Sequence, residues 1–147
     1  MIFFTPPPDF ASRFEVVSCF CDFEGRFLAL QRAKTKPQGS TWGVPAGKID
    51  PGEPALTAIT REAKEEAGLD IVPQFFQTLY VRYDTYDFIY HIFSTELLEQ
   101  PKIILNATEH QDYRWVTPEE SLELPLIPDM DECIRLFYRL TPAYTSL

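Results

Sequence analysis

The stretch from residue 47 to residue 69 constrains this chain more than any other. It begins with a loop rich in glycine and proline over residues 47–53 and continues into a helix predicted over 54–67. Gly68 stands where a helix C-cap is expected. An apolar stripe at helical spacing predicts the face that packs on the core, and it consists of Leu56, Ile59, Ala63 and Ala67.

Three glutamates gather on one turn of this helix. Glu62, Glu65 and Glu66 are spaced i, i+3 and i+4, so their side chains are neighbours. Like charges at this spacing destabilise a helix by about 0.2–0.5 kcal/mol per pair. Arg61 and Lys64 offer partial relief, and a divalent cation such as Mg²⁺ or Mn²⁺ offers more, because hard oxygen ligands suit these ions. The alternative is a solvated acidic helix face.

The loop and helix together resemble the signature of the Nudix hydrolases. That signature reads Gly, five residues, Glu, seven residues, Arg-Glu, an apolar residue, any residue, Glu-Glu, any residue, Gly and an apolar residue. Its one unusual position here is Ala63, which is smaller than the typical aliphatic residue. The matching positions are Gly47, Glu53, Arg61, Glu62, Ala63, Glu65, Glu66, Gly68 and Leu69.

The resemblance implies a hydrolase that cuts a diphosphate bond in a nucleoside diphosphate linked to another group. Such a bond resists attack because its oxygens are negative, so the site must neutralise charge and activate a water. A bound Mg²⁺ or Mn²⁺ supplies both, and a carboxylate takes the proton. The implied roles are metal ligand for Glu62, Glu66 and the Gly47 carbonyl, ligand or general base for Glu65, orientation of the glutamates for Arg61, and loop support for Glu53.

One further catalytic candidate lies outside the signature. Glu109 precedes a predicted strand, and family members often draw a base or an extra ligand from a loop at that place. The alternative is an ordinary exposed glutamate. For the adjacent His110 we expect a surface position. For Arg61 and Glu53 the structural alternative is a salt bridge that ties the loop to the helix, which is compatible with the catalytic roles.

The sequence features that bear on the substrate point to different subfamilies. Residues 45–53 resemble the loop of ADP-ribose pyrophosphatases, but those enzymes carry a proline near the position of Asp84. Residues 28–32 and 42–43 resemble nucleoside triphosphate pyrophosphatases of the MutT type. Dinucleoside polyphosphate hydrolases carry a tyrosine where this chain has Tyr86.

Recognition of a base needs a stacking ring and a hydrogen-bonding edge. Tyr83, Tyr86 and Phe88 are the candidates for the ring. Asp129 is the candidate for the edge, because MutT-type enzymes read the base from the region before the last helix. The structural alternatives are core packing for the rings and a helix N-cap for Asp129.

Composition narrows the class of protein. At 147 residues we expect one domain over 1–147, with a proline-rich lead over 1–12. A net charge of −9 and a pI near 4.6 argue against nucleic-acid binding.

No apolar run predicts a membrane span, and the N-terminal residues do not have the pattern of a signal peptide. The odd number of cysteines predicts no disulfide pattern, and we interpret Cys19 and Cys21 as small core residues rather than a metal pair. We therefore expect a cytoplasmic monomer or homodimer that binds a small nucleotide-type substrate.

The order of elements predicts an α+β fold. The pattern is hairpin, short strand, helix, long hairpin, short strand and helix, and a capping box at Thr117 and Glu120 marks one helix start. The resemblance implies an α/β/α sandwich with a mixed sheet between helices. The predicted strands are 14–23, 26–32, 41–44, 75–83, 87–97 and 113–116, the last helix runs from 129 to about 140, and 99–112 is a predicted loop.

Three functions stay open at this point. The first is a metal-dependent hydrolase, for which the retained glutamates argue. The second is a Nudix-fold module that senses a nucleotide without cutting it, and such a module would be expected to have lost these carboxylates. The third is an isomerase of allylic diphosphates, which would need a cysteine such as Cys19 or Cys21 facing the pocket.

Overall fold

A computed structural model describes residues 1–141 of the chain. Strands are more numerous than helices, as the sequence predicts. The elements in chain order are β1 (Ile2–Phe3), β2 (Ser12–Phe23), β3 (Arg26–Arg32), β4 (Trp42–Gly43), β5 (Ala46–Lys48), α1 (Ala55–Ala67), β6 (Gln74–Arg82), β7 (Asp87–Glu96), β8 (His110–Val116), α2 (Pro118–Ser121) and α3 (Met130–Tyr138).

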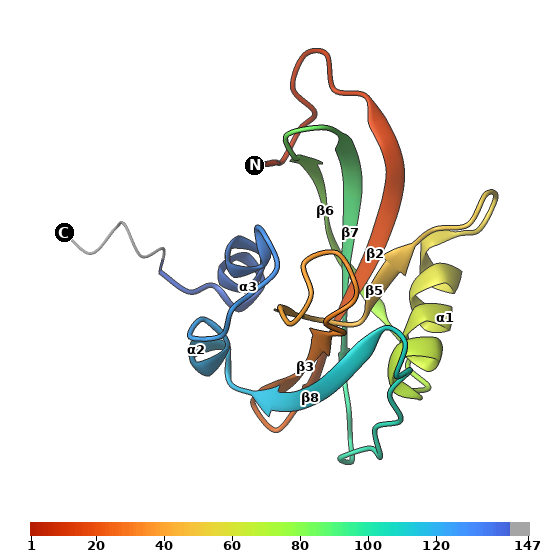
Figure 1. Cartoon of the computed structure of the whole chain (residues 1–147), viewed down its shortest axis with the longest axis vertical. Coiled ribbons are helices and arrows are strands. Elements are labelled where there is room, and N and C mark those ends of the chain that lie inside the picture. Colours follow the sequence, from red (N-terminus) through yellow and green to blue (C-terminus); the bar gives the residue numbers. More distant parts are fainter. Residues whose placement is uncertain (142–147) are drawn as a thin grey trace.

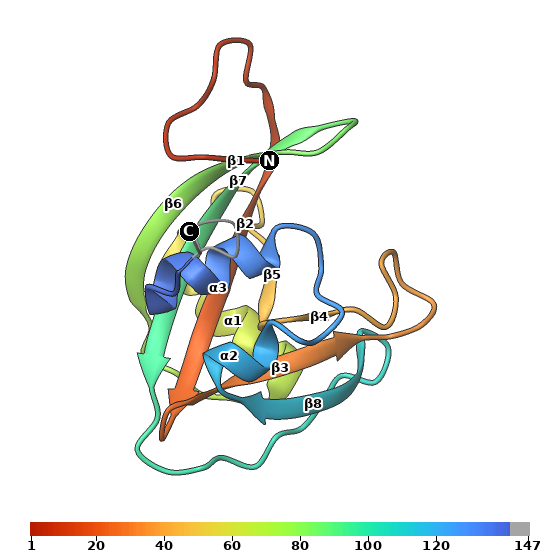
Figure 2. The ribbon, with the colours of Figure 1, turned by 90° about the vertical axis from the view of Figure 1, so that its left-hand side faces the viewer.

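The sheet is built around the long strand β2. Its path runs β1-β6-β7-β2-β3-β4, while β5 pairs with β2 and β8 pairs with β3. The β2–β7 pair is parallel and the other pairs are antiparallel, so the sheet is mixed. Residues 16–18 of β2 pair with β5 on one side and with β7 on the other. Figure 2 shows β2, β7 and β6 running side by side.

Helices cover both faces of the sheet. Helix α1 lies on one side, and α2 and α3 lie on the other (Figure 1). The sequence of β2 explains the two cores, because successive side chains of a strand point to opposite faces. Val17, Cys19 and Cys21 join the core under α1, while Phe20 joins the core under α3 and stacks on Phe137 at a centroid distance of 4.6 Å. The α+β fold with a mixed sheet between helices is confirmed, and so is the burial of both cysteines.

The predicted helix signals occur where the sequence places them. Gly68 ends α1 in the left-handed conformation, with φ at 71°, and its N–H donates to carbonyls of the last turn. At α2, the N–H of Glu120 donates to Thr117 Oγ1 at 3.1 Å, and the N–H of Thr117 donates to Glu120 Oε1 at 2.8 Å. The capping box is therefore present in full.

Several local predictions are wrong. Leu56, in the first turn of α1, is 52% exposed. Glu66 is buried on this helix instead of being a surface residue, and the other buried residues of α1 are Ala58, Ile59, Ala63 and Ala67. Residues 46–48 form a strand rather than a loop, since β2 offers them a free edge. The start of the proline-rich lead likewise forms a short strand, β1, because it pairs with β6.

No helix within residues 1–141 combines the length and the apolarity that a bilayer crossing requires.

A half-buried carboxyl at the end of β2, that of Asp22, gives a prediction about stability. Burial raises the pKa of Asp22 to about 6, although the hydrogen bond from the Tyr138 hydroxyl lowers it. The folded state therefore holds a proton between about pH 4 and pH 6 that the unfolded state releases, so stability falls as the pH rises through this range. We expect Asp22→Asn to raise the free energy of unfolding at pH 7 by about 1 kcal/mol, less than full linkage because the carboxyl is partly solvated.

Urea unfolding at pH 7 and pH 4 checks this expectation. The gain of Asp22→Asn should vanish at pH 4, where the wild-type carboxyl is protonated in the folded state. The control Tyr138→Phe removes the donor and keeps the carboxyl, so it should lower stability at pH 7. A loss of stability in Asp22→Asn at pH 7 would contradict the argument.

Candidate active site

Glu66 is a buried carboxyl beside strand β5. Its side chain is 9% exposed, and Oε1 accepts a hydrogen bond from the N–H of Ala46 at 3.0 Å. Burial raises the pKa of Glu66 to about 8, and the charges of Glu62 and Glu109 raise it further. A buried carboxyl with one donor among residues 1–141 is costly to ionise, so a cation at this place would stabilise its charged form.

Glu62 lies against the backbone of Gly47. A Cβ at position 47 would stand 2.1 Å from the carboxyl carbon of Glu62 and 2.4 Å from each of its oxygens. Real Cβ atoms do not come this close, so any other residue at position 47 would displace the Glu62 carboxyl from its present place. Burial also raises the pKa of Glu62, against the lowering effect of Arg61. Strand β5 and helix α1 are thus in close contact at the Glu62 carboxylate.

Arg61 holds the acidic groups in place. Its Nε and Nη2 each donate to Glu53 at 2.9 Å, as a fork that grips both carboxylate oxygens. Its Nη1 donates to Glu62 at 2.8 Å and to Glu65 at 3.3 Å, and Nη2 also donates to the Lys48 carbonyl at 3.2 Å. The hydrogen bond from Arg61 lowers the pKa of Glu53 to about 2. The salt bridge between loop and helix that the sequence allowed is therefore present, and it orients two of the three glutamates.

Glu109 lies close to this group. Its charge is among the causes of the raised pKa of Glu66, and its carboxylate pairs with Lys36 at 3.0 Å. The turn that carries it is tied to α1, because the N–H of Asn106 donates to the Glu66 carbonyl at 3.3 Å. The predicted candidate from outside the signature and the signature glutamates thus share one region of the molecule.

The expected surface position of His110 is wrong. The side chain is 6% exposed, because β8 begins at His110 rather than at 113 and pairs there with Arg32 of β3. Burial lowers its pKa to about 4, which keeps the ring neutral near pH 7. Its Nδ1 has no hydrogen-bond partner within residues 1–141.

The donor set fits a hard divalent cation. Carboxylate oxygens and a backbone carbonyl are the ligands that Mg²⁺ and Mn²⁺ prefer. In the described part of the chain no three acidic, histidine or cysteine side chains are already gathered as a metal site. The hydrogen bonds explain why, since Arg61 holds Glu62 and Glu65 while Ala46 holds Glu66. A cation would have to compete with these partners.

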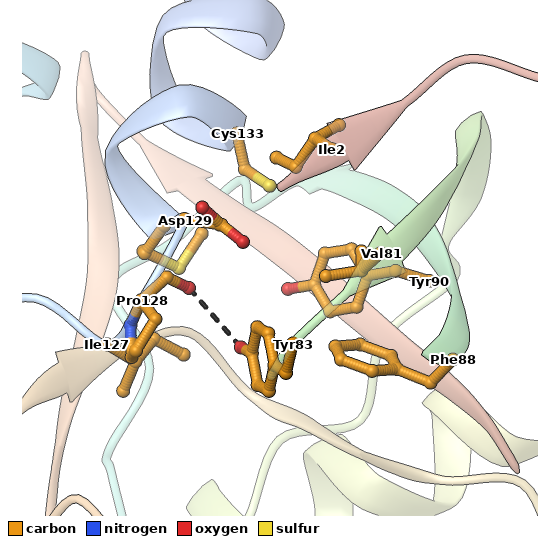
Figure 3. Close-up of a pocket in the computed structure, with 10 residues that line it drawn as sticks. Ile2, Val81, Tyr83, Phe88, Tyr90, Ile127, Pro128, Asp129 and Cys133 are labelled. Atoms are coloured by element: carbon orange, nitrogen blue, oxygen red, sulfur yellow. Dashed lines mark hydrogen bonds between the residues drawn. The ribbon is translucent and has the colours of Figure 1, made fainter. Parts of the chain in front are cut away.

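A second feature is an aromatic pocket on the α3 side of the sheet (Figure 3). Tyr83 donates from its hydroxyl to the Pro128 carbonyl at 3.4 Å, and Figure 3 shows the Asp129 carboxylate across the space from Tyr90. The pocket combines aromatic walls with one carboxylate, which is the composition of a site for a flat polar ring. Its lining comprises Ile2, Val81, Tyr83, Phe88, Tyr90, Ile127, Pro128, Asp129, Met130 and Cys133.

Three of the four residues that the sequence predicts to bind the substrate line this pocket, namely Tyr83, Phe88 and Asp129. Tyr86 does not line it and packs instead on Phe14 and on Tyr83, at centroid distances of 5.5 Å and 5.4 Å. Asp129 does stand at the N-cap position of α3, as the alternative expected, but with φ at 67° its side chain makes no capping hydrogen bond within residues 1–141. Its carboxylate accepts a hydrogen bond from the terminal ammonium of Met1 at 3.0 Å.

Strand pairing connects the pocket to the glutamates. Tyr90 pairs with Val16, and Val16 pairs with Lys48 on β5, so two strand spacings of roughly 10 Å in total separate Tyr90 from Lys48. The ammonium of Lys48 lies 4.2 Å from the ring centroid of Phe14, which stacks on Phe88 at 5.5 Å. Sequence reasoning missed Tyr90 and Lys48. Alternation along β7 could have found Tyr90, since Phe88, Tyr90 and Ile92 share a face.

Comparison with known proteins places these features in a family. The NUDIX domain model matches residues 12–137. The chain is 30% identical over 129 residues to the CTP pyrophosphohydrolase of Escherichia coli K12, covering 88% of this chain and 94% of that protein. It is 28% identical to Phosphatase NudJ of the same strain, over 80% of each chain. Among solved structures, a MutT protein from Methanosarcina mazei Go1 is similar with a TM-score of 0.76 and 25% identity, over 86% of this chain and 93% of that one.

The contact between Gly47 and Glu62 gives a structural prediction. Gly47→Ala pushes the Glu62 carboxyl out of its place and away from Arg61, so we expect a loss of stability of about 0.5–1.5 kcal/mol, the contribution of one hydrogen bond. In the background of Glu62→Ala the obstacle is gone, and Gly47→Ala should then cost little. Urea unfolding of the four proteins of this cycle measures the coupling. Equal costs in both backgrounds would show that the two positions are independent.

Proposed function

The chain belongs to the NUDIX domain family, and from this membership we propose that it hydrolyses a nucleoside triphosphate with the help of Mg²⁺ or Mn²⁺. The family match and the similarity to pyrophosphohydrolases make the chain a Nudix pyrophosphohydrolase that acts on nucleoside diphosphate derivatives. The triphosphate as substrate and the identity of the cation are our proposal. The observation that carries it is the gathering of signature glutamates on the backbone of β5, connected by two strand pairings to an aromatic pocket.

Four residues would hold the cation, namely Glu62, Glu65 and Glu66 with their carboxylates and Gly47 with its carbonyl. When bound, the cation neutralises phosphate oxygens and lowers the pKa of a water. The raised pKa values of Glu62 and Glu66 support this assignment, because both carboxyls are kept in surroundings that favour a positive partner.

The protein's own groups then do three things. Arg61 keeps Glu62 and Glu65 on the side of α1 that faces β5, and Glu53 fixes the guanidinium from the loop. A carboxylate, either Glu109 or Glu65, accepts the proton of the attacking water. The water oxygen bonds to phosphorus while a bridging P–O bond breaks, and the products are a nucleoside monophosphate and pyrophosphate.

The aromatic pocket is the proposed nucleoside site. Tyr83 and Phe88 offer faces on which a base can stack. The ionised carboxylate of Asp129 only accepts hydrogen bonds, so it favours a base edge that presents N–H groups. Tyr86 contributes from outside the pocket by packing on Tyr83. Two strand spacings, roughly 10 Å, separate Tyr90 from Lys48 of β5, and the sugar and the phosphates would have to extend past this strand to the glutamates on its α1 side.

The test is a substrate panel with controlled metal. The panel comprises the nucleoside triphosphates, 8-oxo-dGDP, ADP-ribose, nucleotide sugars and dinucleoside polyphosphates, with release of pyrophosphate and phosphate measured separately. We expect pyrophosphate release from a triphosphate with Mg²⁺ or Mn²⁺, none in excess chelator, and poor support from Ca²⁺, which is larger and less strict in geometry. If only ADP-ribose or a dinucleoside polyphosphate is cleaved, that compound replaces the triphosphate as the substrate. Tight binding without turnover would make the chain a sensing module.

Two variants test Glu109 as the general base. If Glu109 accepts the proton, Glu109→Gln should lower kcat by about 10²–10⁴ with little change in KM. Glu65→Gln is the matched comparison, since the Glu65 side chain is exposed and, within residues 1–141, is bonded only to Arg61, at 3.3 Å. Normal activity of Glu109→Gln together with lost activity of Glu65→Gln would exclude Glu109 as the base and leave Glu65 as ligand or base.

A further inference from the structure

The loop between β3 and β4, residues 33–41, brings a lysine to the glutamate site. Lys36 Nζ lies 3.0 Å from Glu109 Oε1. We propose that Lys36 binds a substrate phosphate, and that it does so by exchange: it holds Glu109 in the free enzyme and leaves it for the triphosphate when substrate binds. The exchange would free the Glu109 carboxylate at the moment when the reaction needs it. This inference rests on the proposed function.

The loop is built to hold Lys36 in one place. The N–H of Lys36 donates to the Ala33 carbonyl at 3.0 Å, and Arg32 Nε donates to the Pro37 carbonyl at 2.9 Å. The turn closes so tightly that a Cβ on Gly39 would lie 2.5 Å from the Lys34 carbonyl oxygen. The backbone under Lys36 is therefore pre-organised, and little ordering is left to be done when an anion binds.

Hydrogen bonds tie this loop to the turn that carries Glu109 and to the start of β8. The N–H of Ala33 donates to the Glu109 carbonyl at 2.9 Å, and the N–H of Lys34 donates to Gln111 Oε1 at 3.1 Å. On its other side the same turn is bonded to α1 through Asn106 and the Glu66 carbonyl. Lys36 is thus fixed relative to the glutamates through two short connections, although it lies far from them in the sequence.

The strength of the ion pair makes exchange feasible. The side chains of Lys36 and Glu109 are 34% and 38% exposed, and pairs of this kind contribute about 0–1 kcal/mol. A triphosphate carries several negative charges and accepts stronger, charge-assisted hydrogen bonds. Other cations in this region have partners of their own. Arg61 is bonded to Glu53, Glu62 and Glu65, Arg32 donates from Nε to the Pro37 carbonyl, and Lys48 lies over the ring of Phe14.

The net charge of −9 gives a further reason for a lysine at this place. An anionic substrate approaches an acidic protein against its overall field, so local positive groups must offset the repulsion. Lys36 can meet the polyphosphate at the rim of the site without leaving an unpaired charge in the free enzyme.

The test compares Lys36→Met with Lys34→Met, a lysine of the same loop whose side chain is exposed. The readouts are the Kd of an α,β-methylene triphosphate analogue with Mg²⁺, measured by calorimetry, and the KM of the matching triphosphate. We expect Lys36→Met to weaken both about tenfold and Lys34→Met to change neither by more than about twofold. One lost charge-assisted contact has this size.

A second comparison separates phosphate binding from mere support of Glu109. In the Glu109→Gln background, Lys36→Met should still weaken analogue binding about tenfold, and Glu109→Gln alone should bind the analogue at least as tightly as wild type. An effect of Lys36→Met that vanishes in that background would reduce Lys36 to a structural partner of Glu109 and overturn the inference.

The outcomes distinguish this inference from the proposed function. Unchanged Kd and KM in Lys36→Met, with normal triphosphate hydrolysis by the wild type, would refute the exchange and leave the proposed function standing. A wild type that neither binds the analogue nor cleaves any triphosphate would refute both.

Discussion

The guanidinium of Arg61 is the contact on which the arrangement of the site depends. Three glutamates on one helical turn repel one another, and Arg61 offsets that repulsion by bonding to two of them. The same group grips both oxygens of Glu53 and reaches the Lys48 carbonyl, so it also fixes the loop and the strand beside the helix. Removing this one side chain would therefore release charges and backbone together.

Strand β5 lies between the glutamates of α1 and the aromatic pocket on the α3 side of the sheet. The would-be Cβ of Gly47 points at Glu62, on the α1 side, while the ammonium of Lys48 lies over Phe14 on the pocket side. Alternation along a strand is the reason that neighbours in sequence serve opposite faces. Three residues thus lie between the glutamate cluster and the aromatic pocket, and β2 holds them in register with β7.

The site is also where the chain departs from ordinary packing rules. Glu66 occupies a buried position on α1 that an apolar residue would fill more cheaply, and its pKa is raised to about 8 as a result. His110 is buried nearby with an unpartnered ring nitrogen, within residues 1–141. Unfavourable burial of polar groups beside a cluster of carboxylates is expected where a protein keeps groups for chemistry rather than for stability.

The sequence by itself determined the helix from residue 55 to residue 67 with its glycine cap, the capping box at Thr117, the two hairpins and the family. These features depend on local periodicity, on caps and on a long motif, which neighbours along the chain are enough to specify. Only the tertiary structure decided that Glu66 is buried, that His110 begins a strand, that Tyr86 lies outside the pocket and that Lys36 meets Glu109. Each of these outcomes depends on which distant segment packs against the residue, and no local pattern encodes that choice.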